Sequence, residues 1–495
     1  MVFNSLPFLL FLVSVLCVFY VIPRRIRVYW LLLASYYFYA FWNVKCTLLL
    51  LLSTVVTFFC GIVLEKVKNN SLKKVTVAVN LSINLGILAL FKYLPFFVNN
   101  LNKLLNLFGD NSVSLGFSLV LPVGISFYTF QAIGYTIDVY RGDISAETNF
   151  AKYALFVSFF PQLVAGPIER SKNLLSQIDN LKKKIPFDIQ RFEEGAFVAL
   201  YGFVMKMIVA DRIAIIVTNV YDKEIGYSFY GLQLVFAAIL FSIQIFCDFA
   251  GYTYIAIGVA EMLGIRLCNN FNAPYLSGSI KEFWCRWHIS LSSWFKDYLY
   301  IPLGGNKKGK IRKYLNLLFV FLVSGLWHGA SWHYVVWGGL HGLTRVIEEA
   351  LSGVAEKAKK LIHYKSGTFS SGILCEVWTF SLVTLFWVFF RANSTNQAID
   401  VIKRMFVNGG WWQLTDGSLL NMGLDGKELN VLFLFISLIL VVDILLKRGR
   451  KVAFELTEQN VWFRFAVFLF GIISVVIFGV YGADYNASQF IYFQF

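Results

Sequence analysis

Long apolar stretches recur along the whole chain, with short polar and basic segments between them. A helix needs about 20 apolar residues, within a range of about 17–25, to span a bilayer. The pattern predicts an all-α polytopic membrane protein with about 11 transmembrane helices, plus re-entrant helices around a central cavity. The candidate segments are 7–22, 29–44, 47–64, 75–93, 117–137, 151–166, 196–220, 230–263, 314–329, 331–347, 373–391, 431–446 and 463–481.

The charges of the loops predict the orientation of these helices. Basic residues cluster just after the first and third apolar stretches, and again at 170–191, 281–313 and 447–451. Because cytoplasmic loops of membrane proteins are enriched in Lys and Arg, these loops are predicted to lie inside. Alternation then places the N-terminus, the loop 392–430 and the C-terminus outside.

The composition excludes several classes of protein. Hydrophobic residues make up 58% of the chain and charged residues only 15%, against about 25% charged in soluble domains. A soluble enzyme, a disordered chain and a disulfide-stapled secreted protein are excluded. The net charge of +15 follows the loops between apolar stretches, so the expected partner is the lipid bilayer and not a nucleic acid. The seven cysteines show no metal-ligand spacing, and no metal is expected.

One pair of apolar segments breaks the alternation. Between the outside loop 94–115 and the inside loop 170–191 an odd number of crossings is needed, yet the segments 117–137 and 151–166 would make two. One of them is therefore predicted to be re-entrant. Irregular backbone at membrane depth requires burial in protein or a wet cavity, so this stretch is expected to pack inside the protein.

Asp248 lies within the apolar segment 230–263. An ionisable side chain at that depth is a functional hypothesis by default. A structural hydrogen bond to Tyr or Ser is the alternative, with equal weight.

Four of the five histidines fall within residues 271–345. His288 and His328 are 40 residues apart, and a tryptophan precedes each of them. Imidazole is the side chain whose pKa best suits proton transfer near pH 7. The pattern favours a site for general-base chemistry, although a single intramembrane histidine is more often a hydrogen-bonding group.

The motifs of this window resemble those of the membrane-bound O-acyltransferases (MBOAT), and among them the bacterial alginate- and peptidoglycan-type polysaccharide O-acetyltransferases. The most specific are WHISL at 287–291, DYLYIPLGG at 297–305 and LWHG at 326–329. LPVGISFYTFQ at 121–131 and GPI at 166–168 are similar to family signatures as well. The resemblance covers nearly the whole chain.

The resemblance implies roles for the histidines. His328 matches the histidine taken as the catalytic base of the family, and His288 matches its second active-site histidine. His333 and His341 are expected to be structural. By the same resemblance, the chain is a single membrane domain, in which 1–115 form N-terminal spans, 116–350 the catalytic core, and 351–495 C-terminal spans with an outside tail.

The resemblance also implies the acyl donor. A cytoplasmic thioester, most simply acetyl-CoA, is the expected substrate, with no bound cofactor. Trp327 is a candidate to bind the oxyanion, because its indole N–H is a donor. Lys307, Lys308 and Lys310 are candidates to attract a phosphorylated donor; an ordinary positive-inside anchor is the favoured alternative for this run.

The last residues, 490–495, are strongly aromatic and resemble the C-terminal motif of a small membrane protein that accompanies the D-alanyl transferases of the family. By that resemblance, Tyr492 is a possible acyl acceptor that hands acetyl to an exported acetyltransferase of the SGNH or GDSL type. An interfacial aromatic anchor is the equally weighted alternative.

The expected function is O-acetylation of an extracytoplasmic polysaccharide, an alginate-like exopolysaccharide or peptidoglycan, at the bacterial cytoplasmic (inner) membrane. One alternative is D-alanyl transfer to teichoic acid. The other is a transporter or flippase that moves an acyl group or lipid without bond chemistry, a class in which glycine-interrupted apolar segments also occur. Paired Trp-His motifs favour the enzyme.

Overall fold

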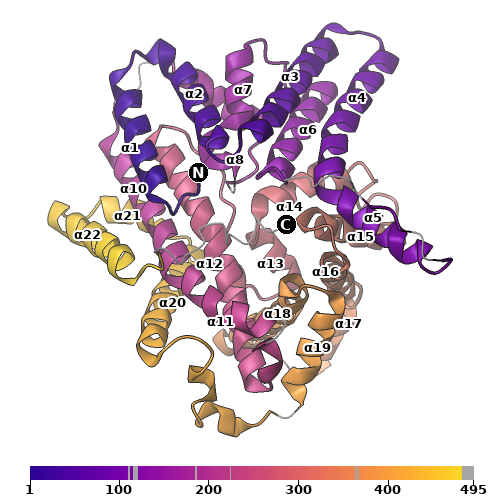
Figure 1. The fold of residues 1–495 in the computed structure, drawn as a ribbon, viewed down its shortest axis with the longest axis vertical. Helices are drawn as coiled ribbons and strands as arrows, with labels where there is room; N and C mark the ends of the chain where they lie inside the picture. The colour runs from indigo at the N-terminus through magenta and orange to yellow at the C-terminus, as the bar shows by residue number, and fades with distance from the viewer. Residues whose placement is uncertain are drawn as a thin grey trace. The chain divides into compact units, whose positions relative to one another are not determined.

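The computed structural model describes residues 1–109, 112–114, 121–164, 166–183, 187–222, 225–361, 363, 365, 367–407 and 409–481. Within these ranges the chain is helical and contains no strand, which confirms the all-α prediction (Figure 1). Six helices are long and apolar enough to cross a membrane, and Leu6–Val21 is a shorter apolar helix. The six lie at Val44–Lys66, Asn70–Leu105, Leu232–Met262, Phe369–Arg391, Gly426–Lys447 and Val461–Phe478. The count of about 11 spans stays a prediction.

The chain divides into two compact units. The first comprises residues 1–199 and 255–268, and the second comprises 200–254 and 269–495. Two helices, α10 (Ile189–Phe203) and α12 (Leu232–Met262), contribute residues to both units.

The first unit is built from helices whose starts are set by capping residues. Ser5 caps α1 by accepting a hydrogen bond from the Phe8 N–H at 3.3 Å, and Asn43 caps α3 in the same way. The helices are α1 (Leu6–Val21), α2 (Arg27–Ala40), α3 (Val44–Lys66), α4 (Asn70–Leu88), α5 (Leu94–Leu105), α6 (Ile125–Arg141), α7 (Phe150–Ser158), α8 (Phe160–Leu163) and α9 (Ser171–Asn180). A π-helical turn, Ala89–Tyr93, joins α4 to α5.

The segment 151–166, one of the two that broke the alternation, is interrupted. The helix α7 ends at Ser158, Phe159 is non-helical, and α8 follows with only four residues. Gly124, the N-cap residue just before α6, has φ +75°, and a Cβ there would lie 2.4 Å from the carbonyl oxygen of Leu163. Nearly every residue of this region is buried, as expected for irregular backbone at membrane depth.

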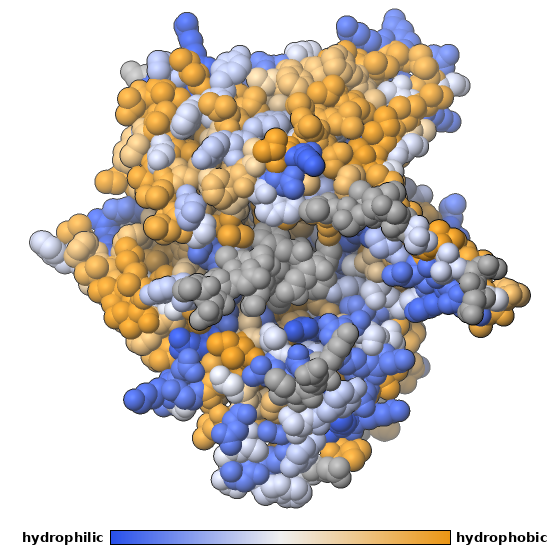
Figure 2. Space-filling model, in the orientation of Figure 1, coloured by the Kyte–Doolittle hydropathy of each residue, from blue (hydrophilic) through white to orange (hydrophobic). Residues whose placement is uncertain are grey.

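The outer surface of the N-terminal helices is apolar. Leu48 and Phe59 of α3 and Val75 of α4 are among the exposed large hydrophobic side chains. Figure 2 shows this hydrophobic covering over the region of α2, α3 and α4. Exposed apolar area on this scale fits contact with lipid, so the chain is a multi-pass membrane protein.

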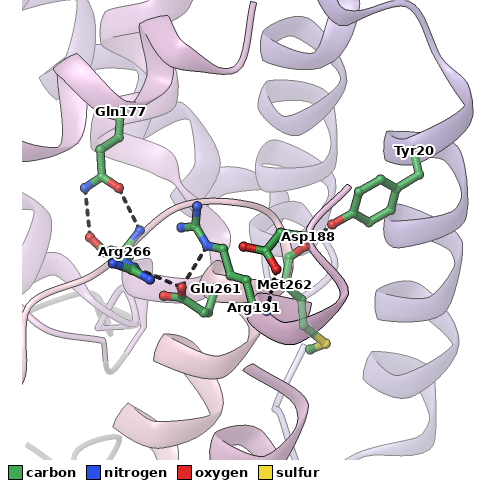
Figure 3. A network of polar contacts seen from close by, with 7 residues as sticks. All are labelled: Tyr20, Gln177, Asp188, Arg191, Glu261, Met262 and Arg266. Atoms are coloured by element: carbon green, nitrogen blue, oxygen red, sulfur yellow. Dashed lines mark hydrogen bonds and ion pairs between the residues drawn. The ribbon is translucent and has the colours of Figure 1, made fainter. Parts of the chain in front are cut away.

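A network of hydrogen bonds and ion pairs stabilises the turn that follows α12 within the first unit (Figure 3). The Glu261 carboxylate accepts hydrogen bonds from Arg191 Nε at 2.7 Å and from Arg266 Nε at 3.1 Å. Gln177 of α9 exchanges two hydrogen bonds with the backbone of Arg266, at 2.7 and 2.8 Å. Tyr20 donates to the backbone at the end of α12. These contacts join α1, α9, α10 and the turn.

The second unit contains the predicted chemical residues. Its helices are α11 (Asp211–Tyr221), α13 (Ile280–Arg286), α14 (Ile289–Phe295), α15 (Lys310–His328), α16 (Trp332–Ala350), α17 (Ser352–Leu361), α18 (Phe369–Arg391), α19 (Thr395–Phe406), α20 (Gly426–Lys447), α21 (Val452–Thr457) and α22 (Val461–Phe478), with the rest of α10 and α12. The helices α15 and α16 run side by side (Figure 1). A Cβ on Gly338 would lie 2.2 Å from the Phe321 carbonyl oxygen, so glycine permits their close approach.

The predicted orientation can be tested by labelling. In a variant without native cysteines, we expect Ser418→Cys to react with a membrane-impermeant thiol reagent in intact cells and Asn306→Cys not to react. The reason is the positive-inside count, which places 306–313 in the cytoplasm and 392–430 outside. The measurement is labelling before and after cell lysis, which serves as the control for accessibility. The opposite labelling pattern would invert the topology.

Candidate active site

His288 stands at the junction of α13 and α14 in a strained conformation. Its backbone has φ +43° and ψ +53°, the left-handed region that residues other than glycine rarely adopt. Asn270 holds the junction from the facing segment. Its carbonyl oxygen accepts from the Ile289 N–H at 3.0 Å, and its Oδ1 accepts from the Ser290 N–H at 3.2 Å and the Ser290 Oγ at 2.9 Å. Backbone strain of this kind is concentrated at functional sites.

The side-chain oxygen of Asn270, Oδ1, also fixes the tautomer of His288. His288 Nδ1 lies 3.0 Å from Asn270 Oδ1. Because that oxygen already accepts from the Ser290 N–H, it faces the ring as an acceptor, and Nδ1 therefore carries the proton. Burial lowers the pKa of His288 to about 3, so the ring is neutral at pH 7. Nε2 then holds a lone pair, in a side chain that is fully buried.

His328 ends α15 and lies close to His288, although 40 residues separate them in the sequence. The two ring centroids are 6.5 Å apart. Trp327 lies near both histidines, with its ring centroid 4.9 Å from His328 and 6.0 Å from His288. Trp337 and Phe390 pack edge-on against His328, at 5.0 and 5.5 Å. The structure thus joins the three predicted residues in one buried aromatic site.

The other two histidines of the window have structural partners. His333 Nδ1 lies 3.0 Å from the Phe389 carbonyl oxygen, which can only accept, so this nitrogen donates. His341 Nδ1 accepts from the Trp284 indole N–H at 3.3 Å, inside a cluster of aromatic rings. Both contacts fit the structural role expected for His333 and His341.

The second unit contains a cavity of about 1390 Å³, and neither His288 nor His328 is among the residues that line it. Its walls come from α13 to α18, and they include Ile289, which follows His288 directly, and Ser324, one helical turn before His328. The cavity therefore reaches residues that adjoin both histidines. Four cationic side chains lie in its walls, namely Lys281, Lys296, Lys313 and Arg345.

Two of these cations are paired and two are not. Glu349 forms ion pairs with Lys313 and with Arg345. No carboxylate among the described residues forms an ion pair with Lys281 or Lys296, whose side chains are exposed, although Lys281 is an electrostatic neighbour of Glu349. These two lysines are therefore available to an anionic group that enters the cavity.

The predicted lysines of the donor side lie elsewhere. Lys307 and Lys308 are exposed on the turn before α15 and Lys310 is exposed as its first residue, and none of the three lines the cavity. The sequence did not single out Lys281 and Lys296, because the run of Lys307, Lys308 and Lys310 contains more basic residues over a shorter stretch. A signal was present, since Lys281 precedes Trp284 and Cys285 at the i, i+3 and i+4 spacing of one helix face, and all three line the cavity.

The profile of the membrane-bound O-acyltransferase family matches residues 144–373, a range that contains both histidines and most of the cavity wall. The protein named "Probable alginate O-acetylase" of Pseudomonas aeruginosa is 39% identical over 440 residues, which cover 88% of this chain and 80% of that relative. The chain belongs to the membrane-bound O-acyltransferase family. It is therefore an acyltransferase.

Two further relatives of this MBOAT protein separate the branches of the family. The peptidoglycan O-acetyltransferase of Helicobacter pylori is 36% identical over 76% of this chain and 73% of the relative. A teichoic acid D-alanyltransferase of Streptococcus thermophilus is 30% identical over only 47% of this chain and 58% of the relative. The longer matches identify an MBOAT acyltransferase of the alginate and peptidoglycan O-acetyltransferase type.

Asp248 of this MBOAT chain has a partner that the sequence analysis did not name. Lys206 Nζ lies 2.6 Å from Asp248 Oδ1 and 2.7 Å from Asp211 Oδ1, and all three side chains are buried. Lys206 belongs to a π-helical turn, Val204–Ala210. The ion pair with Lys206 provides the charge compensation that burial of a carboxylate demands.

Tyr492, the possible acyl acceptor, lies outside the described residues.

The role of Asn270 can be tested by removing its side chain. We expect Asn270→Ala to lower the kcat of acyl transfer by about ten- to a hundredfold, since unpaired buried donors cost about 1–3 kcal/mol. The reason is that His288 loses the acceptor that orients its ring. Steady-state kinetics with separate kcat and KM provide the measurement, with a larger change expected in kcat. The matched control is Ser290→Ala, which removes one donor to the same oxygen; equal losses in both variants would contradict an orienting role.

Proposed function

We propose that this MBOAT protein takes an acetyl group from a cytoplasmic thioester, most simply acetyl-CoA, for O-acetylation of an extracytoplasmic polysaccharide. His328 is the catalytic base in this proposal. The observation that carries it is the pair of buried histidines, with ring centroids 6.5 Å apart, beside a cavity large enough for a thioester donor. The names of the relatives support an alginate-like exopolysaccharide or peptidoglycan as the acceptor glycan.

The reaction is an acyl transfer to a hydroxyl. His328 removes the hydroxyl proton, the oxygen attacks the thioester carbonyl, the C–S bond breaks, and the thiolate leaves and takes up a proton. The neutral Nε2 of His288 offers a second acceptor close to His328. The indole N–H of Trp327, whose ring lies near both histidines, is the candidate donor to the developing oxyanion.

The cavity suggests how the donor is held. Its walls combine apolar residues, such as Leu317 and Val320 of α15, with the two exposed cations Lys281 and Lys296. The apolar surface suits an acyl chain and pantetheine arm, and the lysines suit phosphate groups. In this proposal the donor's anionic end lies beside Lys281 of α13 and Lys296, the residue that follows α14.

We expect Lys281→Gln and Lys296→Gln each to raise the KM for acetyl-CoA by about two- to fivefold, the effect of one exposed ionic contact. The kcat should change little, because neither lysine touches the histidines. The measurement is initial rate against acetyl-CoA concentration at low salt. A combined Lys307→Gln, Lys308→Gln and Lys310→Gln variant is the comparison; a larger KM increase in that variant would move the donor site to the turn before α15.

Thiol release distinguishes this function from the alternatives. The purified protein in detergent should release free thiol from acetyl-CoA when an acceptor is present. A D-alanyl transferase would take its acyl group from a carrier protein, and a transporter or flippase would release no thiol. The shorter match to the teichoic acid D-alanyltransferase also favours acetyl transfer.

The transfer across the membrane involves Tyr492 in this proposal. Its phenol gives its proton to His328 and takes the acetyl group as an ester, and an exported SGNH- or GDSL-like acetyltransferase then moves the acetyl group onto the glycan. The support is the aromatic end at 490–495 and its resemblance to an acyl-carrying motif. The protein works in the bacterial cytoplasmic membrane, with both termini outside. An aromatic anchor is the alternative role for the same residues.

A further inference from the structure

Helix α17 has only ten residues, and it packs on little of the protein. Each of its described side chains is exposed, and Val354 and Leu361 are 63% and 81% exposed. An isolated helix shorter than about 12–15 residues is marginal in water, even with a favourable sequence. A helix of this length with exposed apolar side chains is therefore expected to be stabilised by a surface that lies outside the described protein.

The two sides of α17 differ in character. Glu356, the single acidic residue of the helix, lines the cavity. Val354, Lys357 and Leu361 follow the i, i+3 and i+7 spacing of one helix face. Val354 is two residues before Glu356, which is a rotation of about 200° around the helix axis. The face turned away from Glu356 therefore combines apolar residues with Lys357 and the nearby Lys360, and in the described part of the chain no carboxylate forms an ion pair with either lysine.

The neighbouring helices bring α17 close to the membrane. On α16, which precedes it, Leu343 and Ile347 are exposed apolar residues, and Leu351 continues their i, i+4 row to the start of α17. The next helix, α18, is a candidate span that begins at Phe369, soon after α17 ends. The connection 351–368 contains four lysines and one acidic residue, so the positive-inside rule places it in the cytoplasm. Helix α17 is thus expected at the cytoplasmic surface of the bilayer.

We propose that α17 lies on the cytoplasmic surface of the membrane and binds anionic lipid head groups through Lys357 and Lys360. Val354 and Leu361 enter the boundary between the head groups and the acyl chains, and the lysine stems extend their charges to the lipid phosphates. The negative surface potential of the cytoplasmic leaflet attracts basic residues beside a span. Because Ala355 lines the cavity, this attachment also holds one wall of the cavity at the membrane surface.

Quenching by labelled lipids tests this position. The full chain, without native cysteines and with Val354→Cys or Glu356→Cys, would carry a fluorophore on the new thiol and be reconstituted in vesicles that contain a nitroxide-labelled phosphatidylcholine. We expect quenching at position 354 to exceed that at 356 by at least about twofold, because only the first faces the lipid. Quenching at 354 should increase when phosphatidylglycerol replaces part of the phosphatidylcholine, since each lysine near an anionic surface contributes about fivefold in affinity.

Two charge variants of the Val354→Cys chain identify the lysines. Lys357→Gln combined with Lys360→Gln should abolish the response to phosphatidylglycerol. Lys66→Gln combined with Lys68→Gln, which removes two exposed lysines at the end of α3, should respond as the parent chain does. Equal quenching at the two labelled positions, no response to phosphatidylglycerol, or an unchanged response in the α17 variant would overturn the proposal and leave this face to water or to a protein. None of these measurements requires acyl transfer, so their outcome is independent of the proposed function.

Discussion

We expect His328→Ala to reduce acyl transfer by at least about a hundredfold, since a positioned general base contributes about 10²–10⁴-fold in rate. His328 is buried at the end of α15, against Trp337 and Phe390 and near His288. Among the described residues, no other histidine both ends a helix and packs against Trp337 and Phe390. The measurement is the initial rate of thiol release from acetyl-CoA in the presence of acceptor.

The control for His328→Ala is a histidine outside the site. His363 is exposed, and its backbone has φ +51°, which asparagine tolerates. His363→Asn should keep the wild-type rate. Both variants should elute from size exclusion as the wild type does. If folded His328→Ala retains more than about a tenth of the wild-type activity, His328 is not the base.

The second large effect concerns Tyr492. We expect Tyr492→Phe to lower acetylation of the cell-envelope glycan to about a tenth or less of the wild-type level, because the change keeps the ring and removes the nucleophilic oxygen. An anchor needs only the ring at the membrane interface. The measurement is the acetate released by mild base from isolated glycan of cells that express each variant.

The matched control is Tyr481→Phe, which makes the same change at an exposed tyrosine whose hydroxyl donates to the Val476 backbone. It should acetylate glycan as the wild type does. Equal acetylation by Tyr492→Phe and Tyr481→Phe would show that the C-terminal residues anchor the chain without carrying acetyl.

The sequence was sufficient for the class of protein and for the pair of histidines. Apolar stretches of membrane-spanning length predicted the all-α membrane fold, because a bilayer imposes length and composition on each crossing. The Trp-His motifs selected His288 and His328, and packing places their rings 6.5 Å apart. The number of spans could not be derived, since helices such as α15 and α16 have 19 residues each but are not apolar enough to count among the six candidate spans.

The residues that support the site could not be predicted from the sequence, because their roles depend on tertiary contacts. Asn270 is 18 residues before His288, and only the left-handed turn at His288 brings them together. The partner of Asp248, Lys206, lies 42 residues away on another element. For Lys281, only the cavity distinguishes it from the basic residues of an ordinary cytoplasmic loop.

Mass analysis of cell-envelope glycans tests whether this protein is needed for polysaccharide O-acetylation. Glycans would be isolated from cells that lack the protein and from the same cells with the wild-type chain or His328→Ala restored. We expect O-acetyl groups that mild base removes in cells with the wild-type chain, and none above background in the other two strains. Equal O-acetylation of the glycans in all three strains, or D-alanyl esters in place of acetyl, would contradict it.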